Sequence, residues 1–275
     1  MKTSYFKYLI CLYFLPVFLI IISGCGWRQG SNAERENIFS ARANEQIAAN
    51  STQPEKKRAH PDYLKLARTL IKQSRYDIAL VQLKEAEKKE HDNPEIFYLK
   101  GVCLRMKKDY FKAIAQYEKS LKIKPDYSYA HNGLGVVYDL MGEHKKAVYS
   151  YQKAIEINPA GYRFYNNLGL SLLTTGQIEF ASKNFKKSLS LNPGNKRTIN
   201  NLGVAYGMMG KYDFALAEFN KTGTPADAYN NMGYVYECLK DFKNALLMYD
   251  KALKLKPDHL YARENSARVK KIYLK

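Results

Sequence analysis

The 275-residue sequence has few of the residues that build metal, disulfide or catalytic sites. It contains four cysteines, one tryptophan and five histidines, and the histidines are dispersed singly along the chain. No two histidines have the spacing of a metal-binding pair, no Gly-rich phosphate loop follows a strand pattern, and no Ser or Cys nucleophile motif is present. We therefore expect a non-enzymatic protein without a cofactor or metal. The alternative is an enzyme or regulatory subunit whose catalytic centre lies in a groove.

Acidic residues are also in short supply, with 26 Asp and Glu against 44 Lys and Arg, for a net charge of +18. The basic residues are scattered, often as Lys-Lys pairs beside acids, and no nucleic-acid-binding motif is present. This pattern favours a solvated basic surface over nucleic-acid binding. Attraction to anionic phospholipid or to an acidic partner is the alternative that the charge leaves open.

Only one long apolar run is present, from residue 8 to residue 22, and it is short for a membrane span. Lys2 and Lys7 precede it, as in a targeting segment. The run ends in Ile22-Ser23-Gly24-Cys25, which resembles the lipobox of bacterial lipoproteins. The resemblance implies a signal peptide over 1–24 and a covalent lipid on Cys25. An ordinary signal peptide or anchor helix that happens to carry a cysteine is the alternative.

Residues 25–59 are polar and show no sustained apolar period, which predicts a flexible tether. A coil of this length spans on the order of 30 Å, so the rest of the chain can stand off a membrane. In the bacterial sorting scheme an Asp after the lipidated cysteine favours retention in the inner membrane, and Gly26 is no such signal. We expect a cell-envelope protein on the periplasmic face of the outer membrane.

A sequence pattern of 34 residues repeats through the remainder of the chain. It is clearest in 128–161, where Leu134, Gly135, Tyr138, Ala147 and Tyr151 hold fixed offsets that recur in the other units. Its period and residue order resemble the tetratricopeptide repeat, a helix-turn-helix unit. The resemblance implies an all-α, right-handed superhelical solenoid with a capping helix over 260–275. The six expected repeats are 60–93, 94–127, 128–161, 162–195, 196–225 and 226–259.

Glycine recurs at two fixed positions in these units. Gly142, Gly176 and Gly210 stand where a first helix needs a left-handed residue at its end. A second glycine position predicts close approach of the two helices, at Gly101, Gly135, Gly169, Gly203 and Gly233.

The fifth unit is four residues short, and the stretch from Asn220 to Pro225 replaces the last turn of its second helix. This notch is either a docking feature or a neutral deletion.

Groove-facing positions follow from the family resemblance as the second, fifth, ninth, twelfth and thirteenth residues of a unit. The fifth gives Asn132, Asn166, Asn200 and Asn230, and the ninth gives Val136, Leu170, Val204 and Tyr234. The thirteenth adds Leu140, Thr174, Met208 and Cys238. Such an amide row beside an apolar stripe suits an extended or helical peptide, although the amides could instead bond neighbouring units. The adjacent Asn167, Asn201 and Asn231 are expected to serve packing.

Taken together, these features predict a membrane-anchored adaptor that binds protein or peptide partners. The lipobox, linker and repeat array, with the closing stretch from Thr224 to Tyr234 and on through Arg263-Glu264-Asn265, resemble the lipoprotein of the tight-adherence (Flp) pilus assembly system. That resemblance implies a pilotin-like part in assembling a pilus or secretion apparatus, with secretin or other assembly subunits as partners. The alternative is an envelope scaffold that docks peptidoglycan-processing enzymes.

Replacing the predicted lipid attachment residue, Cys25→Ala, should abolish acylation and stop signal removal at this site. The thiol is the attachment point, and each buried CH₂ of an acyl chain contributes about 0.8 kcal/mol to membrane binding. Labelling of cells with a fatty-acid probe measures the effect. Labelling that persists in the variant would contradict the assignment.

Overall fold

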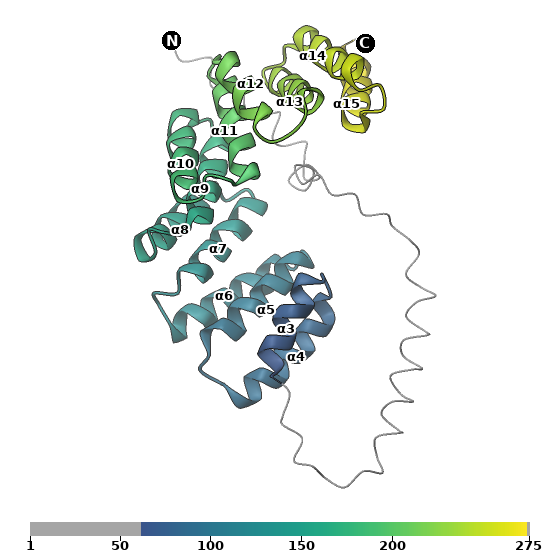
Figure 1. Ribbon diagram of the computed structural model, residues 1–275. Helices are drawn as coiled ribbons and strands as arrows, with labels where there is room; N and C mark the ends of the chain where they lie inside the picture. The colour runs from purple at the N-terminus through teal and green to yellow at the C-terminus, as the bar shows by residue number, and fades with distance from the viewer. Residues whose placement is uncertain (1–61, 274–275) are drawn as a thin grey trace, which may run out of the picture.

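The computed structural model describes residues 62–273, which form thirteen α-helices and no strand (Figure 1). The predicted signal peptide, Cys25, the tether and the first two residues of the first repeat lie outside the described residues. No helix in the described range is long and apolar enough to cross a membrane. The helices form six pairs and a closing helix, as the repeat pattern predicts, so the expected all-α solenoid is confirmed.

Each pair consists of a first helix and a second helix joined by a short turn. The first helices are α3 (Tyr63–Lys72), α5 (Pro94–Met106), α7 (Ser128–Leu140), α9 (Tyr162–Thr174), α11 (Lys196–Met208) and α13 (Pro225–Cys238). The second helices are α4 (Tyr76–Lys89), α6 (Tyr110–Ile123), α8 (His144–Ile157), α10 (Ile178–Leu191), α12 (Tyr212–Asn220) and α14 (Phe242–Leu255). The closing helix is α15 (Leu260–Tyr273).

The two helices of a pair meet where an aromatic ring of the second lies against a glycine of the first. A Cβ atom added to Gly169 would lie 2.5 Å from Cε1 of Phe185, well inside van der Waals contact. The same contact recurs in four other pairs, between Gly101 and Tyr117, Gly135 and Tyr151, Gly203 and Phe219, and Gly233 and Tyr249. The glycines therefore allow the two helices to approach closely, as predicted, and the atoms nearest to each glycine belong to the aromatic ring of the second helix.

Successive pairs stack along the chain, and each first helix contacts both helices of the preceding pair (Figure 1). One continuous core spans three pairs, from Ala147 and Tyr151 in α8 to Ala205 and Met208 in α11. Because each pair buries its surface only against its neighbours, the array is a solenoid in which local sequence sets local structure.

Every turn between the paired helices contains one residue in the left-handed region. In three pairs it is the expected glycine, with φ of 79° at Gly142, 77° at Gly176 and 75° at Gly210. In the other three pairs the same position holds Ser74, Lys108 or Lys240, with φ of 61°, 64° and 61°. The backbone geometry of the turn is thus kept even where the residue has a Cβ, at a cost in strain.

The fifth pair is shortened in its second helix. α12 has 9 residues where the other second helices have 14. α13 then starts at Pro225 after a capping box, in which Thr224 and Asp227 satisfy each other's backbone N–H groups. α13 still contacts α11 and α12, so the stack continues through the notch.

The closing helix α15 occupies the place of a seventh first helix. It contacts α13 and α14 and buries Ala262, Asn265, Ser266 and Val269. His259, which is only 5% exposed, begins the helix: its Nδ1 accepts a hydrogen bond from the Ala262 N–H at 3.1 Å. Its Nε2 lies 3.1 Å from the Asp227 carboxylate, which connects the closing helix to the capping box of α13.

At the left-handed turn position, introducing a glycine and removing a glycine should change the stability of the fold in opposite directions. Lys108→Gly removes the strain of a side chain at positive φ and should stabilise the fold by about 0.5–1 kcal/mol. Gly142→Ala should destabilise it by about 1 kcal/mol, through the backbone alone, because a Cβ there meets no atom within 4 Å. Urea unfolding of both variants measures this. Changes of the same sign would contradict the explanation.

Candidate functional site

The first helices line one side of the stack, which we call the inner face. Neighbouring first helices contact one another along the described chain, α3 with α5, α5 with α7, and so on to α13 with α15. Successive second helices approach one another less closely over the same residues. The stack therefore curves with its first helices on the inner side, where the predicted groove residues lie.

The predicted amide row lies on this face and links neighbouring units. The side-chain oxygen of Asn132 accepts a hydrogen bond from Asn167 Nδ2 at 2.9 Å. Asn166 accepts one from Asn201 at 2.9 Å, and Asn230 accepts one from Asn265 at 3.0 Å. Each bond joins residues 35 positions apart, so one amide of a unit holds one amide of the next. The expected packing role of Asn167 and Asn201 is therefore seen directly.

Contrary to the expectation, two members of the amide row are buried from solvent. Asn166 is 5% exposed and Asn200 is 8% exposed, whereas Asn132 and Asn230 are half-buried. The Asn166 oxygen also accepts a hydrogen bond from the Thr198 hydroxyl at 3.1 Å. The expectation of an open groove position is thus wrong for Asn166 and Asn200, because contacts with the next unit enclose them. Peptide binding by the row stays a prediction, most directly for Asn132.

At the notch, Thr222 takes the place of the missing amide partner. Four residues are absent between Gly203 and Gly233 relative to the 34-residue period, so the next unit is shifted by about one turn. Asn231 accepts from its neighbour Asn230 at 3.4 Å, and the Asn200 oxygen instead accepts from the Thr222 hydroxyl at 2.6 Å. Thr222 therefore donates to the Asn200 oxygen of α11, which receives no amide from the shifted next unit.

The predicted apolar stripe is partly exposed. Val136, Leu170, Val204 and Tyr234 are half-buried, and the first three pack against the continuous core. Leu140 is 41% exposed, but the thirteenth-position residues Met208 and Cys238 are only 8% and 5% exposed. Assigning these last two to the groove is therefore wrong, since the adjoining units cover them.

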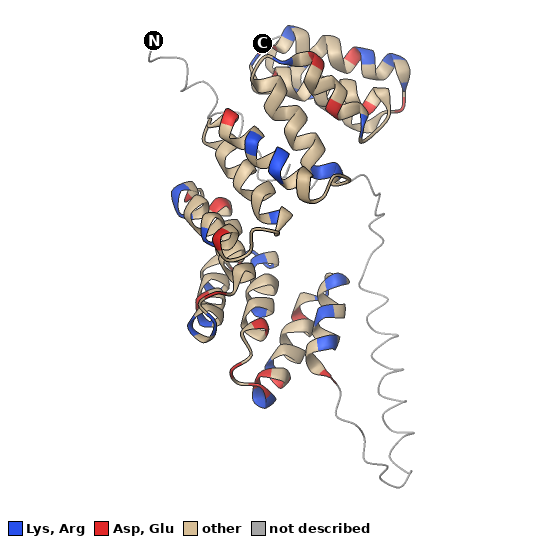
Figure 2. Cartoon of the chain, turned by 60° about the vertical axis from the view of Figure 1, so that its left-hand side comes forward, with Lys and Arg blue, Asp and Glu red and all other residues tan. Residues whose placement is uncertain are grey.

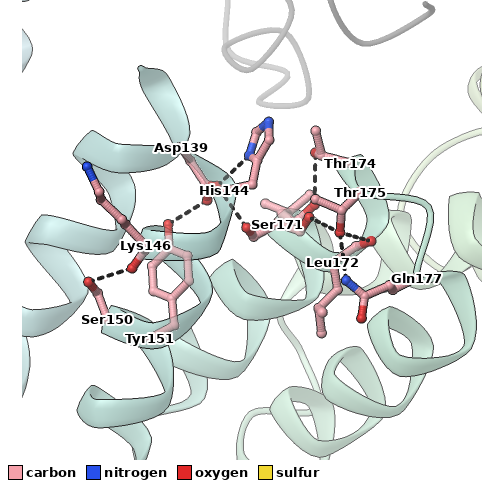
Figure 3. A network of polar contacts seen from close by, with 11 residues as sticks. Asp139, His144, Lys146, Ser150, Tyr151, Ser171, Leu172, Thr174, Thr175 and Gln177 are labelled. Carbon is pink, nitrogen blue, oxygen red and sulfur yellow. Dashed lines mark hydrogen bonds and ion pairs between the residues drawn. The ribbon is translucent and has the colours of Figure 1, made fainter. Parts of the chain in front are cut away.

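Carboxylates on the inner face are bonded to other parts of the fold. Asp139 receives three donors: the Tyr151 hydroxyl at 2.9 Å, the Ser171 hydroxyl at 2.8 Å and His144 Nδ1 at 3.0 Å (Figure 3). Glu237 receives the Tyr249 hydroxyl at 2.8 Å. Burial, together with the adjacent carboxylate, raises the pKa of both tyrosines, so each hydroxyl stays protonated and donates.

The polar residues beside the buried rings have a signature in the sequence. A charged residue stands twelve positions before each buried tyrosine ring, in the pairs Arg105 and Tyr117, Asp139 and Tyr151, and Glu237 and Tyr249. Where the ring is Phe185 or Phe219, the same position is Leu173 or Gly207. Burial raises the pKa of Tyr117 to about 12, with the Arg105 guanidinium opposing that rise. The Tyr151 and Tyr249 hydroxyls thus have an acceptor at this position, whereas the buried Tyr117 hydroxyl has no hydrogen-bond partner in the part of the chain that the structure describes.

Glu95, Asp227 and Glu237 on the inner face are also bonded to other side chains. Glu95 accepts two hydrogen bonds from the Arg68 guanidinium, at 2.8 and 2.6 Å. Asp227 accepts hydrogen bonds from Thr224 and His259. Glu237 accepts hydrogen bonds from Nε and Nη2 of Arg268 at 3.0 and 2.9 Å.

By contrast, three arginines on the inner face, Arg105, Arg163 and Arg197, form no ion pair with a carboxylate in the part of the chain that the structure describes. Charges of both signs are mixed over the whole stack (Figure 2). On the inner face of α5, α7, α9 and α11, however, the charge without an ion pair is positive.

Tyrosines gather beside these arginines at the N-terminal half of the inner face. The rings of Tyr98, Tyr127 and Tyr129 lie with centroids 5.7 to 6.0 Å apart, and Tyr129 contacts Phe164 at 5.8 Å. Tyr129 is 45% exposed. Rigid aromatic side chains next to arginine are the residues most enriched at protein-binding surfaces.

Family models of the tetratricopeptide repeat match residues 64–128, 128–160, 162–195 and 226–259, more than half of the sequence. The chain belongs to the tetratricopeptide-repeat family. Proteins of this family are protein-interaction scaffolds that bind protein or peptide partners, and the inner face of the present repeats has the corresponding chemistry. The shortened fifth unit, 196–225, lies outside the matched ranges.

Solved structures of other tetratricopeptide-repeat proteins share the fold. PilF of Pseudomonas aeruginosa has a TM-score of 0.60 at 19% identity, covering 75% of this chain and 96% of its own. YrrB, described as having an unusual peptide-binding site, has a TM-score of 0.52 at 24% identity, covering 66% and 96%. MamA has a TM-score of 0.50 at 25% identity, covering 65% and 96%. No curated protein matches the sequence.

Two cysteines lie among the described residues of the repeats. Cys103 and Cys238 are both buried, four units apart as expected. Burial raises the pKa of the Cys103 thiol to about 11, so it is not a nucleophile at neutral pH. Among the described residues, no group of three His, Cys, Asp or Glu side chains could hold a metal ion.

Truncating the buried amide, Asn166→Ala, should destabilise the fold by about 1–3 kcal/mol, because the buried Asn201 amide loses its acceptor. The matched variant Asn132→Ala breaks the equivalent bond at a half-buried site, where water can replace it, and should cost less than about 1 kcal/mol. Urea unfolding compares them. Equal losses in the two variants would show that burial does not decide the role of the row.

Proposed function

We propose that this protein is a lipid-anchored, non-enzymatic adaptor of the bacterial cell envelope, whose inner face holds an acidic segment of a partner protein. The observation that carries the proposal is the imbalance of charge on that face. Glu95, Asp139, Asp227 and Glu237 are bonded within the fold, whereas Arg105, Arg163 and Arg197 have no carboxylate partner among the described residues.

The partner segment should combine carboxylates with apolar side chains. Guanidinium groups bind carboxylates through two parallel hydrogen bonds, and Arg163 and Arg197 are exposed on neighbouring first helices. Val136, Leu170 and Leu140 offer partly exposed apolar surface between them, and Tyr129 offers an aromatic contact. An extended or helical peptide can use both kinds of contact along the row of first helices.

The location of the adaptor follows from the N-terminal segment. The lipobox-like sequence supports attachment through Cys25, and the polar residues up to 59 support a tether that leaves the inner face free. We place the protein at the periplasmic face of the outer membrane.

Its resemblance to the tight-adherence pilus lipoprotein supports a pilotin-like part in assembling a pilus or secretion apparatus, with secretin or other assembly subunits as partners. PilF has the same fold, which is compatible with this role. Docking of peptidoglycan-processing enzymes is the alternative, and cross-linking in membranes followed by identification of the partner separates the two roles.

Reversing charge on the inner face should weaken binding of an acidic peptide by tenfold or more, about 1.4 kcal/mol. The test uses the full chain with Arg163→Glu and Arg197→Glu and a labelled peptide of alternating Glu and Leu, followed by fluorescence anisotropy. The matched control, Lys84→Glu with Lys243→Glu, makes the same change in net charge on two second helices and should bind as the original chain does.

Equal weakening by both pairs would mean that only net charge matters and would contradict an inner-face site. Binding of a Lys-Leu peptide as tightly as the Glu-Leu peptide would contradict the acidic preference.

A further inference from the structure

We propose that a second surface, formed by the exposed side chains of α6, α8 and α10, docks on an anionic phospholipid bilayer. We call it the outer surface. It lies on second helices, so it is distinct from the inner face, and the proposal does not depend on which partner the inner face binds.

Each of these helices exposes one large aromatic ring. Phe111 is 77% exposed, Tyr149 is 62% exposed and Phe180 is 58% exposed. The same helices bury another ring completely or nearly so, at Tyr117, Tyr151 and Phe185. Tyr149 and Tyr151 are two residues apart, which is about 200° around a helix, so the exposed ring points away from the core. Packing within the fold therefore does not explain the exposed rings.

Lysines surround the rings. α6, α8 and α10 together contain nine lysines and only three acidic residues, Glu118, Glu156 and Glu179. Lys145 and Lys153 lie one helical turn before and after Tyr149. Lys183 and Lys187 follow Phe180 on the same side of α10, and the Lys183 ammonium lies 5.5 Å from the centre of the Phe180 ring. The surface is an alternation of aromatic rings and cationic groups.

Several of these lysines are not neutralised by the fold. Lys112, Lys119, Lys146 and Lys153 form ion pairs with Asp109, Glu87, Glu143 and Glu156. In the described part of the chain, Lys122, Lys145, Lys183, Lys186 and Lys187 have no carboxylate partner. An uncompensated cationic surface attracts anionic headgroups within a Debye length.

The kind of basic residue separates a bilayer from a protein as the occupant. The six second helices contain fifteen lysines and no arginine, whereas Arg68, Arg105, Arg163 and Arg197 all lie on first helices. Protein interfaces are enriched in arginine and depleted in lysine. Lysine, with a flexible apolar stem and a strongly hydrated charge, suits a fluid surface of phosphates, where an adjacent ring enters the interfacial region. The outer surface therefore matches lipid headgroups better than a protein.

The chain itself offers a matched control surface on α12. Phe214 is 62% exposed, the same as Tyr149, but the lysines next to it are only the caps Lys211 and Lys221, and Asp213 and Glu218 balance their charge. A general tendency of exposed rings to enter lipid would affect Phe214 and Tyr149 alike, whereas docking through the outer surface would affect Tyr149 alone.

The experiment places one tryptophan probe on each surface of the full chain. The only native tryptophan, Trp27, is first changed to Phe, and Tyr149→Trp or Phe214→Trp is then introduced. Vesicles of phosphatidylethanolamine and phosphatidylglycerol, with brominated acyl chains, are compared with phosphatidylcholine vesicles. The probe at 149 should shift to shorter wavelength and be quenched at least twofold in the anionic vesicles only, and 0.5 M NaCl should reverse this. The probe at 214 should not change.

A charge variant completes the test, with Lys145→Glu, Lys183→Glu and Lys187→Glu added to the Tyr149→Trp chain. Quenching should be lost while the far-ultraviolet circular dichroism stays helical. Both probe variants keep the same N-terminal segment, so insertion of that segment cannot produce a difference between them. Equal quenching of the two probes, no quenching of either, or a shift at 149 that requires a partner protein instead of vesicles would each overturn the proposal.

Discussion

The contact of an aromatic ring with a glycine backbone, repeated once per helix pair, is the constraint on which the rest of the stack depends. The two residues are 16 positions apart in five pairs, for example Gly169 and Phe185. A Cβ would occupy the volume of the ring, so the distance between the paired helices is set by this one fit. In the first pair the corresponding residues are Ala67 and Leu83, and both are fully buried. The Leu83 side chain is smaller than an aromatic ring, so it leaves room for the Ala67 methyl group.

That core contact also influences the charge of the inner face. A tyrosine in the ring position brings a buried hydroxyl, which needs a polar partner, and Asp139 and Glu237 supply it from the inner face. The Asp139 carboxylate is bonded in this way and balances no arginine of that face, whereas Glu237 also pairs with Arg268. The positive character of the inner face therefore follows partly from a requirement of the core, and not only from the number of basic residues.

Within the helices of the six pairs, arginine lies only on the first helices, whereas lysine lies in both layers and mostly on the second helices. Arginines lie on the first helices and the fifteen lysines of the second helices on the opposite layer, which gives the molecule two cationic surfaces with different recognition chemistry. A tether from a membrane would allow one surface to face lipid while the other faces a partner. The notch at α12 interrupts the lysines of the second layer but leaves the inner row bonded through Thr222.

The sequence by itself determined the repeat, its helices and the glycine turns at Gly142, Gly176 and Gly210, because these depend on contacts within one 34-residue unit that recur in register. It did not reveal that Ser74, Lys108 and Lys240 are left-handed turn residues. Their backbone adopts positive φ because the packing of the paired helices imposes the same turn. Nor could it separate Asn132 from Asn166, which hold the same position in the repeat. Their difference in burial, like the burial of Met208 and Cys238, was decided by how each unit covers the next, and a pattern within one unit does not contain that information.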